Sequence, residues 1–184
     1  QGVSSAASDV YKRQVVGREL AFADYQNDLN KFREKELSDI KKYLDSKNIA
    51  AQKVNNSVYM VMEKEGTGRS ADSGMMVGVK YSGKNFDGKY FDSNVDSTKQ
   101  TMAHPLETFY FVSKREGAIQ GMLESISAFK VGGKGTLYIP STLAYGPQGS
   151  MPVIKPYENL IFEIEVVEVK EAPKNQTQGM PPGV

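Results

Sequence analysis

The stretch "GAIQGMLESISAFKVGGKGTLYIP", residues 117–140, encodes one short helix followed at once by a strand. Four of its apolar residues have the i, i+3, i+4, i+7 spacing of a single buried helix face: Ile119, Met122, Leu123 and Ile126. The glycine pair Gly132 and Gly133 closes this segment, because glycine readily adopts the backbone conformation that terminates helices. Residues 134–140, "KGTLYIP", then alternate as a strand does.

Strands dominate the chain from residue 57 onward. Alternating apolar and polar residues predict them in five segments: 57–64, 75–83, 106–112, 134–140 and 159–170. The last segment places four apolar residues on one face: Leu160, Phe162, Ile164 and Val166. Its spacing slips between Val166 and Val169, which predicts a β-bulge. The sequence therefore predicts an α+β domain at residues 57–170, in which strands accompany one short core-facing helix.

The region before this domain predicts a long amphipathic helix from Arg18 to about Lys47. Its apolar residues recur at intervals close to 3.6: Phe22, Tyr25, Leu29, Phe32, Leu37, Ile40 and Leu44. The periodicity is lost near "SKNIAAQKVNN", where asparagines indicate a connection. Residues 15–56 are therefore expected to form a helical extension and a linker.

The two ends of the chain are not expected to join the domain. Residues 1–14, "QGVSSAASDVYKRQ", are polar and aperiodic and resemble a translated adaptor sequence, so we treat them as a non-native leader. Residues 171–184 are rich in Pro, Gly, Asn and Gln, and their low apolar content predicts a disordered tail. Because no apolar run approaches the roughly 20 residues that span a bilayer, a soluble chain is expected.

The composition excludes several classes of function. Lys and Arg number 23 against 22 Asp and Glu, so the net charge of +1 offers no basic surface for nucleic acid. The absence of cysteine excludes a disulfide, a thiolate nucleophile and a Cys-ligated zinc. No metal or other cofactor is expected.

Three local patterns imitate functional motifs. "VGGKGT", residues 131–136, lacks the first glycine and the Ser or Thr of a phosphate-binding loop, and it follows a helix instead of a strand. "DSNVDS", which begins at Asp92, resembles half of a calcium loop but has Ser97 where that loop needs glycine. His104, the one imidazole of the chain, has no acidic neighbour at ligand spacing and is expected to be a solvated loop residue.

The hairpin "GVKYSGKNFDGKYFDSN", residues 78–94, brings Tyr81, Phe91 and Asp92 around a turn. Taken in order with residues 117–140, with "LAYGPQG" and with "NLIFEIEVVEV", it resembles the FKBP-type peptidyl-prolyl cis/trans isomerases over about residues 57–170. That family's fold is a strongly twisted antiparallel sheet wrapped around one short helix, which agrees with the periodicities. The resemblance implies an enzyme that accelerates rotation about Xaa-Pro bonds in proteins.

The resemblance also implies a proline pocket. Its walls would be five aromatic rings: Tyr81, Phe91, Phe109, Tyr145 and Phe162. Its floor would be Ile119 and Met122, and its polar edge would be Asp92. An apolar pair in the loop after "AYG" would complete it: Val153 and Ile154. For the rings, ordinary core packing is the alternative, and Asp92 could instead cap a local turn.

The implied mechanism needs no acid, base, nucleophile or cofactor. Rotation about a peptide bond meets a barrier of about 18–20 kcal/mol because resonance makes the bond partly double. A dry aromatic site favours the twisted, less polar amide, and the Tyr145 hydroxyl and the Ile119 N–H would hold the substrate carbonyls. Together with Asp92 and Phe91, these two form the expected catalytic set. The implied partners are proline-containing polypeptides and rapamycin-like macrolides.

The sequence departs from the family pattern at several places. Met122 stands where the family often has Trp, and Ala118 where a larger aliphatic residue is common. Residues 95–107 are inserted beside the pocket, and Lys155 replaces a usual proline. These departures keep open an alternative function, a non-catalytic client-binding or chaperone module with the same fold.

The N-terminal helix lies outside the minimal family fold. Several bacterial members carry such a segment, which dimerises or cradles unfolded clients, so a homodimer through this helix is one expectation. The alternative is that the helix packs on its own domain. Because similar bacterial proteins are often exported, the resemblance implies a periplasmic or outer-membrane-associated location, including a lipoprotein that has lost its signal and acylated cysteine.

Overall fold

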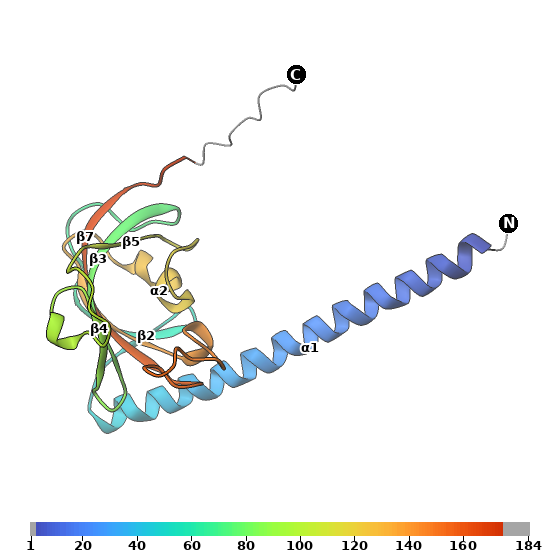
Figure 1. Ribbon diagram of the computed structural model, residues 1–184, viewed down its shortest axis with the longest axis horizontal. Coiled ribbons are helices and arrows are strands. Elements are labelled where there is room, and N and C mark those ends of the chain that lie inside the picture. Colours follow the sequence, from blue (N-terminus) through green and yellow to red (C-terminus); the bar gives the residue numbers. More distant parts are fainter. Residues whose placement is uncertain (1–2, 175–184) are drawn as a thin grey trace, which may run out of the picture.

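Helix α2 (Gln120–Ser125) lies in the concave face of a strongly curved sheet, and a much longer helix, α1 (Val3–Ser46), runs along the outside and away from it (Figure 1). The computed structural model describes residues 3–174, with side chains from Lys12 onward. Within this range one sheet of seven strands has the order β1-β2-β6-β7-β3-β4, with β5 also paired to β3. The strands are β1 (Gln52–Val54), β2 (Val58–Lys64), β3 (Met75–Asn85), β4 (Tyr90–Ser93), β5 (Phe109–Val112), β6 (Lys134–Ile139) and β7 (Leu160–Glu171).

All strand pairs in this sheet are antiparallel, and β7 lies between β6 and β3. The register of β3 and β7 shifts once: Gly78 pairs with Glu168, whereas Val79 pairs with Val166. Val167 is therefore the extra residue of a bulge, which confirms the bulge predicted between Val166 and Val169. The bulge increases the local twist and helps the sheet to curve around α2.

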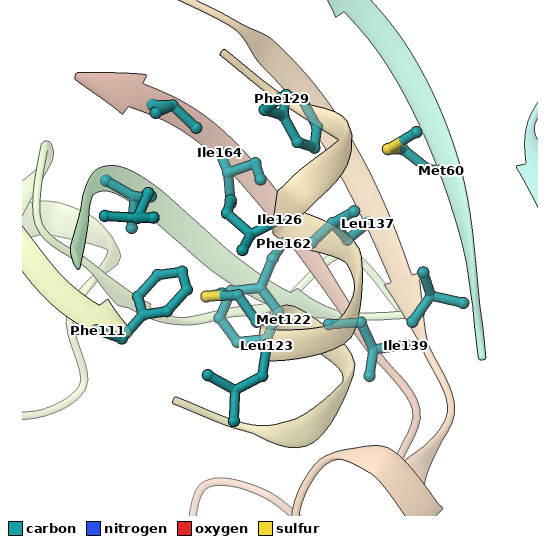
Figure 2. Close-up of a cluster of buried hydrophobic side chains, with 14 of the residues drawn as sticks. Met60, Phe111, Met122, Leu123, Ile126, Phe129, Leu137, Ile139, Phe162 and Ile164 are labelled. Carbon is teal, nitrogen blue, oxygen red and sulfur yellow. The ribbon is translucent and has the colours of Figure 1, made fainter. Parts of the chain in front are cut away.

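The core lies between α2 and the concave face of the sheet (Figure 2). Met122, Leu123 and Ile126 are buried, as their helical spacing predicts. α2 is one and a half turns long and continues into a 3₁₀ turn, η2 (Ile126–Ala128). The remaining large side chains of this core come mainly from the strands: Val58, Val77, Val79, Phe111, Leu137, Ile139, Leu160, Phe162, Ile164 and Val166.

The C-terminal half of α1 covers the opposite face of the sheet. Its buried residues Leu37, Ile40 and Leu44 pack on a second cluster from three strands: Tyr59, Tyr138 and Ile161. This half of the helix therefore packs on its own domain, which is one of the two predicted alternatives. The N-terminal half projects beyond the sheet (Figure 1), and four of its apolar side chains are exposed: Val16, Leu20, Phe22 and Tyr25.

Several predicted boundaries were wrong. The long helix begins at Val3 instead of Arg18, since residues 3–17 contain no proline that would interrupt it. The linker contains a strand that was not predicted, β1, whereas the predicted hairpin is confirmed by the antiparallel pair of β3 and β4. The predicted disordered tail falls mainly on residues 175–184, outside the described range. α1 has 44 residues, but no helix in the described range is apolar enough to cross a membrane.

Candidate active site

A small pocket of about 80 Å³ opens between the start of α2 and the concave face of the sheet. Its lining contains all five aromatic rings predicted for it, together with Asp92, Ala118, Ile119 and Met122. The rings pack mostly edge to face: Tyr81 lies 5.8 Å from Phe109, and Phe91 lies 5.7 Å from Phe162 between centroids. Because these contacts join four segments distant in sequence, the walls support one another and the cavity is shaped before any ligand arrives.

Strand register places the inner rings. On β3 and β7, Tyr81 is paired with Ile164, and Gly83 is paired with Phe162. Gly83 leaves the space that the rings occupy, because a Cβ atom there would lie 2.6 Å from the Phe91 ring and 2.9 Å from the Phe162 ring. The sequence analysis did not identify Gly83 as a site residue. The sequence nevertheless contained an indication, because a glycine in the interior of a strand often marks a place where another group packs close to the backbone.

A side chain takes the place of a missing strand beside Tyr81. β4 pairs with one half of β3 and β5 with the other, which leaves the β3 edge at residues 80–81 without a partner strand. The buried Asn94 side chain fills the gap: it accepts from Tyr81 N at 2.7 Å and donates to the carbonyls of Val79 at 3.0 Å and Glu107 at 2.8 Å. Asn94 thereby fixes the backbone that carries the Tyr81 ring.

Asp92 forms the polar edge of the pocket. Its Oδ2 accepts a hydrogen bond from the Tyr81 hydroxyl at 2.5 Å, and its Oδ1 accepts from Ser93 N at 2.8 Å. Burial, followed by the hydrogen bond to Asp92, raises the pKa of Tyr81 well above its ordinary value. Tyr81 therefore stays protonated and remains a donor, so this pair holds the Tyr81 ring in the pocket wall.

His104 is an exposed loop residue, as predicted, but it has an acidic partner that was not predicted. Its Nε2 lies 2.7 Å from Asp92 Oδ1, and its Nδ1 lies 2.9 Å from the Pro105 carbonyl oxygen. Both neighbours are acceptors, so the doubly protonated imidazolium satisfies both contacts. The hydrogen bond to Asp92, followed by that to Pro105, raises the pKa of His104 above its ordinary value. The acidic partner twelve residues earlier was outside the ligand spacings that sequence inspection considered.

The inserted segment, residues 95–107, folds back over the side of the pocket. It begins with a 3₁₀ turn, η1 (Ser97–Lys99), which Asp96 caps by accepting from Thr98 N at 3.0 Å. Thr101 then donates from its hydroxyl to the Phe91 carbonyl at 2.7 Å. The "DSNVDS" pattern that imitates a calcium loop is therefore used for turns and edge contacts, and no cluster of potential metal ligands occurs among residues 3–174.

The start of α2 forms the pocket floor. Met122 is almost fully buried, and Ile119, the residue before the helix, has an extended backbone. None of the hydrogen bonds between described residues uses the Ile119 N–H. A donor at the floor is thus available to a ligand, since the first N–H groups of a helix have no partner within it.

Tyr145 stands at the mouth of the pocket. It belongs to the loop of residues 140–159 that joins β6 to β7, and 41% of its surface is exposed. Its hydroxyl has no hydrogen-bond partner in the described part of the chain. Partial burial, followed by the charge of Asp92, raises the pKa of Tyr145, so the hydroxyl is a permanent donor near neutral pH. Core packing does not explain such a position.

Val153 and Ile154 do not line this pocket. They lie in an adjoining cavity of about 190 Å³, which shares Phe91, Asp92 and Tyr145 with the first. Met102 and His104 of the inserted segment line the same cavity. The apolar pair is therefore next to the pocket, where the chain that flanks a bound residue would lie.

The alternative of ordinary core packing describes only part of the arrangement. Phe91 and Phe162 are each less than 10% exposed and belong to the main core, yet they also face the pocket. Tyr81 and Phe109 are only half-buried. The same rings thus stabilise the fold and present an apolar surface to the cavity.

The family model of FKBP-type peptidyl-prolyl cis-trans isomerases matches residues 67–167. The chain is 37% identical over 108 residues to an FK506-binding protein of Neisseria meningitidis, which covers 59% of this chain and 92% of that protein. It is 38% identical over 117 residues to FkpA of Escherichia coli, which covers 64% of this chain and 39% of that protein.

The chain spans less than half the length of several of the curated relatives that it matches. FK506-binding protein 4 of Dictyostelium discoideum is 41% identical over 102 residues, which is 55% of this chain and 25% of that protein. Among solved structures, FkpA of Escherichia coli has a TM-score of 0.61 at 26% identity, covering 94% of this chain and 80% of that one. A peptidyl-prolyl cis-trans isomerase of Pseudomonas syringae has a TM-score of 0.59 at 26% identity, covering 75% of this chain and 96% of that one.

Proposed function

This chain belongs to the FKBP-type peptidyl-prolyl cis-trans isomerase family, and we propose that it accelerates rotation about Xaa-Pro bonds in polypeptides. The family binds proline-containing substrates. One observation carries the proposal: an apolar pocket lined by aromatic rings has the unpartnered Tyr145 hydroxyl at its mouth and the unpartnered Ile119 N–H at its floor. Such a site binds an apolar ring and donates hydrogen bonds to the carbonyls beside it.

The pocket favours the twisted amide over the planar one. In a planar Xaa-Pro bond, resonance places partial negative charge on the carbonyl oxygen, and water solvates that charge. In the twisted form resonance is lost, so the amide is less polar and loses less on transfer to an apolar site. Binding that is stronger for the transition state than for the ground state raises the rate, by about tenfold for each 1.36 kcal/mol.

The two donors would orient the substrate backbone. Tyr145 Oη is free and protonated, and Ile119, whose N–H has no partner among the described residues, lines the same cavity. Hydrogen bonds from both to substrate carbonyls would hold the flanking chain while the prolyl ring rests on Met122. Asp92 would act on the pocket itself, because it fixes the Tyr81 ring and places a carboxylate at the edge. No proton is transferred in this mechanism.

An isomerisation assay on a proline-containing peptide tests the proposal. The wild-type chain is expected to accelerate cis/trans exchange, and Tyr145→Phe is expected to lower kcat/KM by about three- to tenfold, since one donor is lost. Tyr110→Phe is the matched control, because that tyrosine is exposed, bonds Glu168 and is not part of the pocket lining. A wild-type chain with no effect on exchange would refute the proposed activity.

The exposed side chains on the outer half of α1 favour a second candidate function, client binding without useful turnover. Val16, Leu20, Phe22 and Tyr25 offer unfolded polypeptides an apolar surface that is independent of the pocket. A pure holdase would suppress the aggregation of a denatured protein and leave the exchange rate of a proline peptide unchanged. The paired assays therefore separate the two candidates.

Three finer features belong to the same proposal. A rapamycin-like macrolide would occupy the pocket, and titration calorimetry at high ligand concentration tests this. A homodimer would form through the exposed face of α1, and sedimentation of the wild type against Leu20→Glu with Phe22→Glu tests it. A periplasmic or outer-membrane-associated location is supported by family resemblance, and fractionation of cells that make the native protein tests it.

A further inference from the structure

Glu36 is a buried carboxylate in the C-terminal half of α1, only 5% exposed. Its Oε1 accepts a hydrogen bond from the Ser141 hydroxyl, and its Oε2 accepts from Thr142 N at 3.2 Å and from the Thr142 hydroxyl at 2.8 Å. Every one of these partners donates to a carboxylate oxygen. Burying such a polar group is costly unless hydrogen bonds replace its water, so this site is organised around the Glu36 side chain.

The groups that Glu36 binds lead directly to Tyr145. Ser141 and Thr142 begin the 3₁₀ turn η3 (Ser141–Leu143), at the start of the 140–159 loop. The Ser141 carbonyl then accepts from Ala144 N at 2.9 Å and from Gly146 N at 2.9 Å. These two residues flank Tyr145 on either side. The backbone at Tyr145 is thus tied to the residue that Glu36 holds.

The far end of the same loop also touches α1. The Phe32 ring packs edge-on against the Tyr157 ring, with 5.2 Å between centroids and an interplanar angle of 73°. Tyr157 N donates to the Gly146 carbonyl at 2.9 Å, which links this contact to the turn at Tyr145. Phe32 and Glu36 are four residues apart and lie on one face of α1. The helix therefore contacts the loop both before and after Tyr145.

We propose that Glu36 is a positioning residue for the isomerase site: through Ser141 and Thr142 it fixes where the Tyr145 hydroxyl stands over the pocket. The inference rests on the proposed role of Tyr145. Helix α1, which lies outside the minimal catalytic fold, thereby becomes part of the machinery that sets turnover. Loss of the Glu36 contacts would let the loop sample positions in which the hydroxyl misses the substrate carbonyl, and small misplacements of this kind reduce rates strongly.

Variants at Glu36 test the inference in the full chain. Glu36→Gln is expected to lower kcat about threefold and Glu36→Ala about tenfold, with smaller changes in KM, because the apolar pocket itself is intact. Glu34→Gln is the matched control: it neutralises an exposed glutamate on the same helix, and its kcat is expected to stay within about 1.5-fold of wild type. Circular dichroism and a thermal melt identify the temperatures at which all variants remain folded.

A double-mutant cycle shows whether the effect passes through Tyr145. In a Tyr145→Phe background, Glu36→Ala is expected to lower kcat by less than about twofold, because the hydroxyl that it positions is already absent. An equal loss in both backgrounds would overturn the inference. At the other end of the contact, Thr142→Val is expected to reproduce the Glu36 defect, and Thr142→Ser, which keeps the hydroxyl, is expected to restore turnover.

A structural readout separates this inference from the proposed activity. With ¹³C-labelled tyrosine, the Tyr145 ring signals are expected to shift and broaden in Glu36→Ala and to stay unchanged in Glu34→Gln. If the wild type has no isomerase activity but the ring responds in this way, the proposed function fails and the positioning contact stands. If the wild type is active and neither the ring signals nor kcat respond to Glu36→Ala, the positioning inference alone is refuted.

Discussion

His104 Nε2 lies 2.7 Å from Asp92 Oδ1, so the inserted segment supplies a cationic partner to the carboxylate at the pocket edge. Both ring nitrogens of His104 face acceptors, since Nδ1 lies 2.9 Å from the Pro105 carbonyl. The other group near the ring is the neutral side chain of Gln100, whose Nε2 is 3.4 Å from each ring nitrogen. The geometry thus favours the charged imidazolium.

The pKa of His104 is expected to lie above the ordinary value of about 6.5. Because the chain has a single histidine, one imidazole signal in an NMR pH titration of the untagged protein reports it without assignment. Asp92→Asn removes the main cause of the shift and is expected to lower the midpoint toward 6.5. A wild-type midpoint at or below 6.5 would contradict the contact.

The same pair predicts how stability depends on pH. The folded pKa of His104 is raised, so its contribution is fully present below the unfolded pKa and is lost as pH rises through the folded pKa. The free energy of unfolding of the wild type should therefore fall above pH 6.5 relative to that of His104→Gln. Since the pair is partly exposed, the difference is expected to be small and to shrink further in high salt.

Gly83→Ala is expected to damage the pocket while the fold survives. The added methyl would lie 2.6 Å from the Phe91 ring and 2.9 Å from the Phe162 ring, so both must move into the cavity or away from it. Overpacking of this kind costs about 1–3 kcal/mol of stability, and a prolyl peptide should bind at least several-fold more weakly. Gly17→Ala, where nothing lies within 4 Å of the new methyl, should leave binding unchanged.

Asn94→Ala is expected to loosen Tyr81. The substitution removes the acceptor of Tyr81 N and the donors to the Val79 and Glu107 carbonyls from a buried side chain. A cost of about 2–4 kcal/mol is expected in chemical denaturation, with faster hydrogen exchange at the Tyr81 amide. Asn27→Ala, on the exposed part of α1, should change neither quantity measurably. An unchanged Tyr81 exchange rate would exclude the proposed bracing by Asn94.

The Phe162→Ala variant tests whether the Phe162 ring serves the pocket as well as the core. The ring is 6% exposed and belongs to both, so a loss of about 3–5 kcal/mol in stability and a loss of ligand binding are expected together. Ile164→Ala is the matched control, because Ile164 lies two residues on in β7, is equally buried and does not line the pocket. It should cost a comparable stability yet spare binding in the folded protein. If both variants bind equally well, Phe162 is a core residue only.

The fold and the family were predictable because both depend on patterns that recur along the chain. Alternation located the long strands, the spacing of Met122, Leu123 and Ile126 located α2, and the slip after Val166 located the bulge. The predicted fold class and the predicted family are confirmed. The hairpin predicted at residues 78–94 is formed by β3 and β4, whereas the short strand β1 was missed because three residues carry too little periodicity.

Site residues were predictable where the family pattern specifies them and not where a contact is particular to this chain. The roles of the ten predicted residues remain predictions, although the structure places eight of them in one pocket lining. Asn94 and His104 were missed because their partners are defined by the path of the inserted segment, which no local pattern records. Glu36 did leave a signal: it stands at i+4 between Phe32 and Ile40, a carboxylate within an apolar stripe.

The projection of α1 sets how long a polypeptide must be to reach from the pocket to Val16, the outermost of the four exposed apolar residues. Val16 precedes Glu36, which contacts the loop at Tyr145, by twenty residues, or about 30 Å of helix at a rise of 1.5 Å per residue. An extended chain covers about 3.3–3.6 Å per residue, so bridging that distance takes roughly nine residues. Short prolyl peptides can therefore report on the pocket alone, whereas contact with the full length of the exposed helix face is reserved for longer unfolded segments.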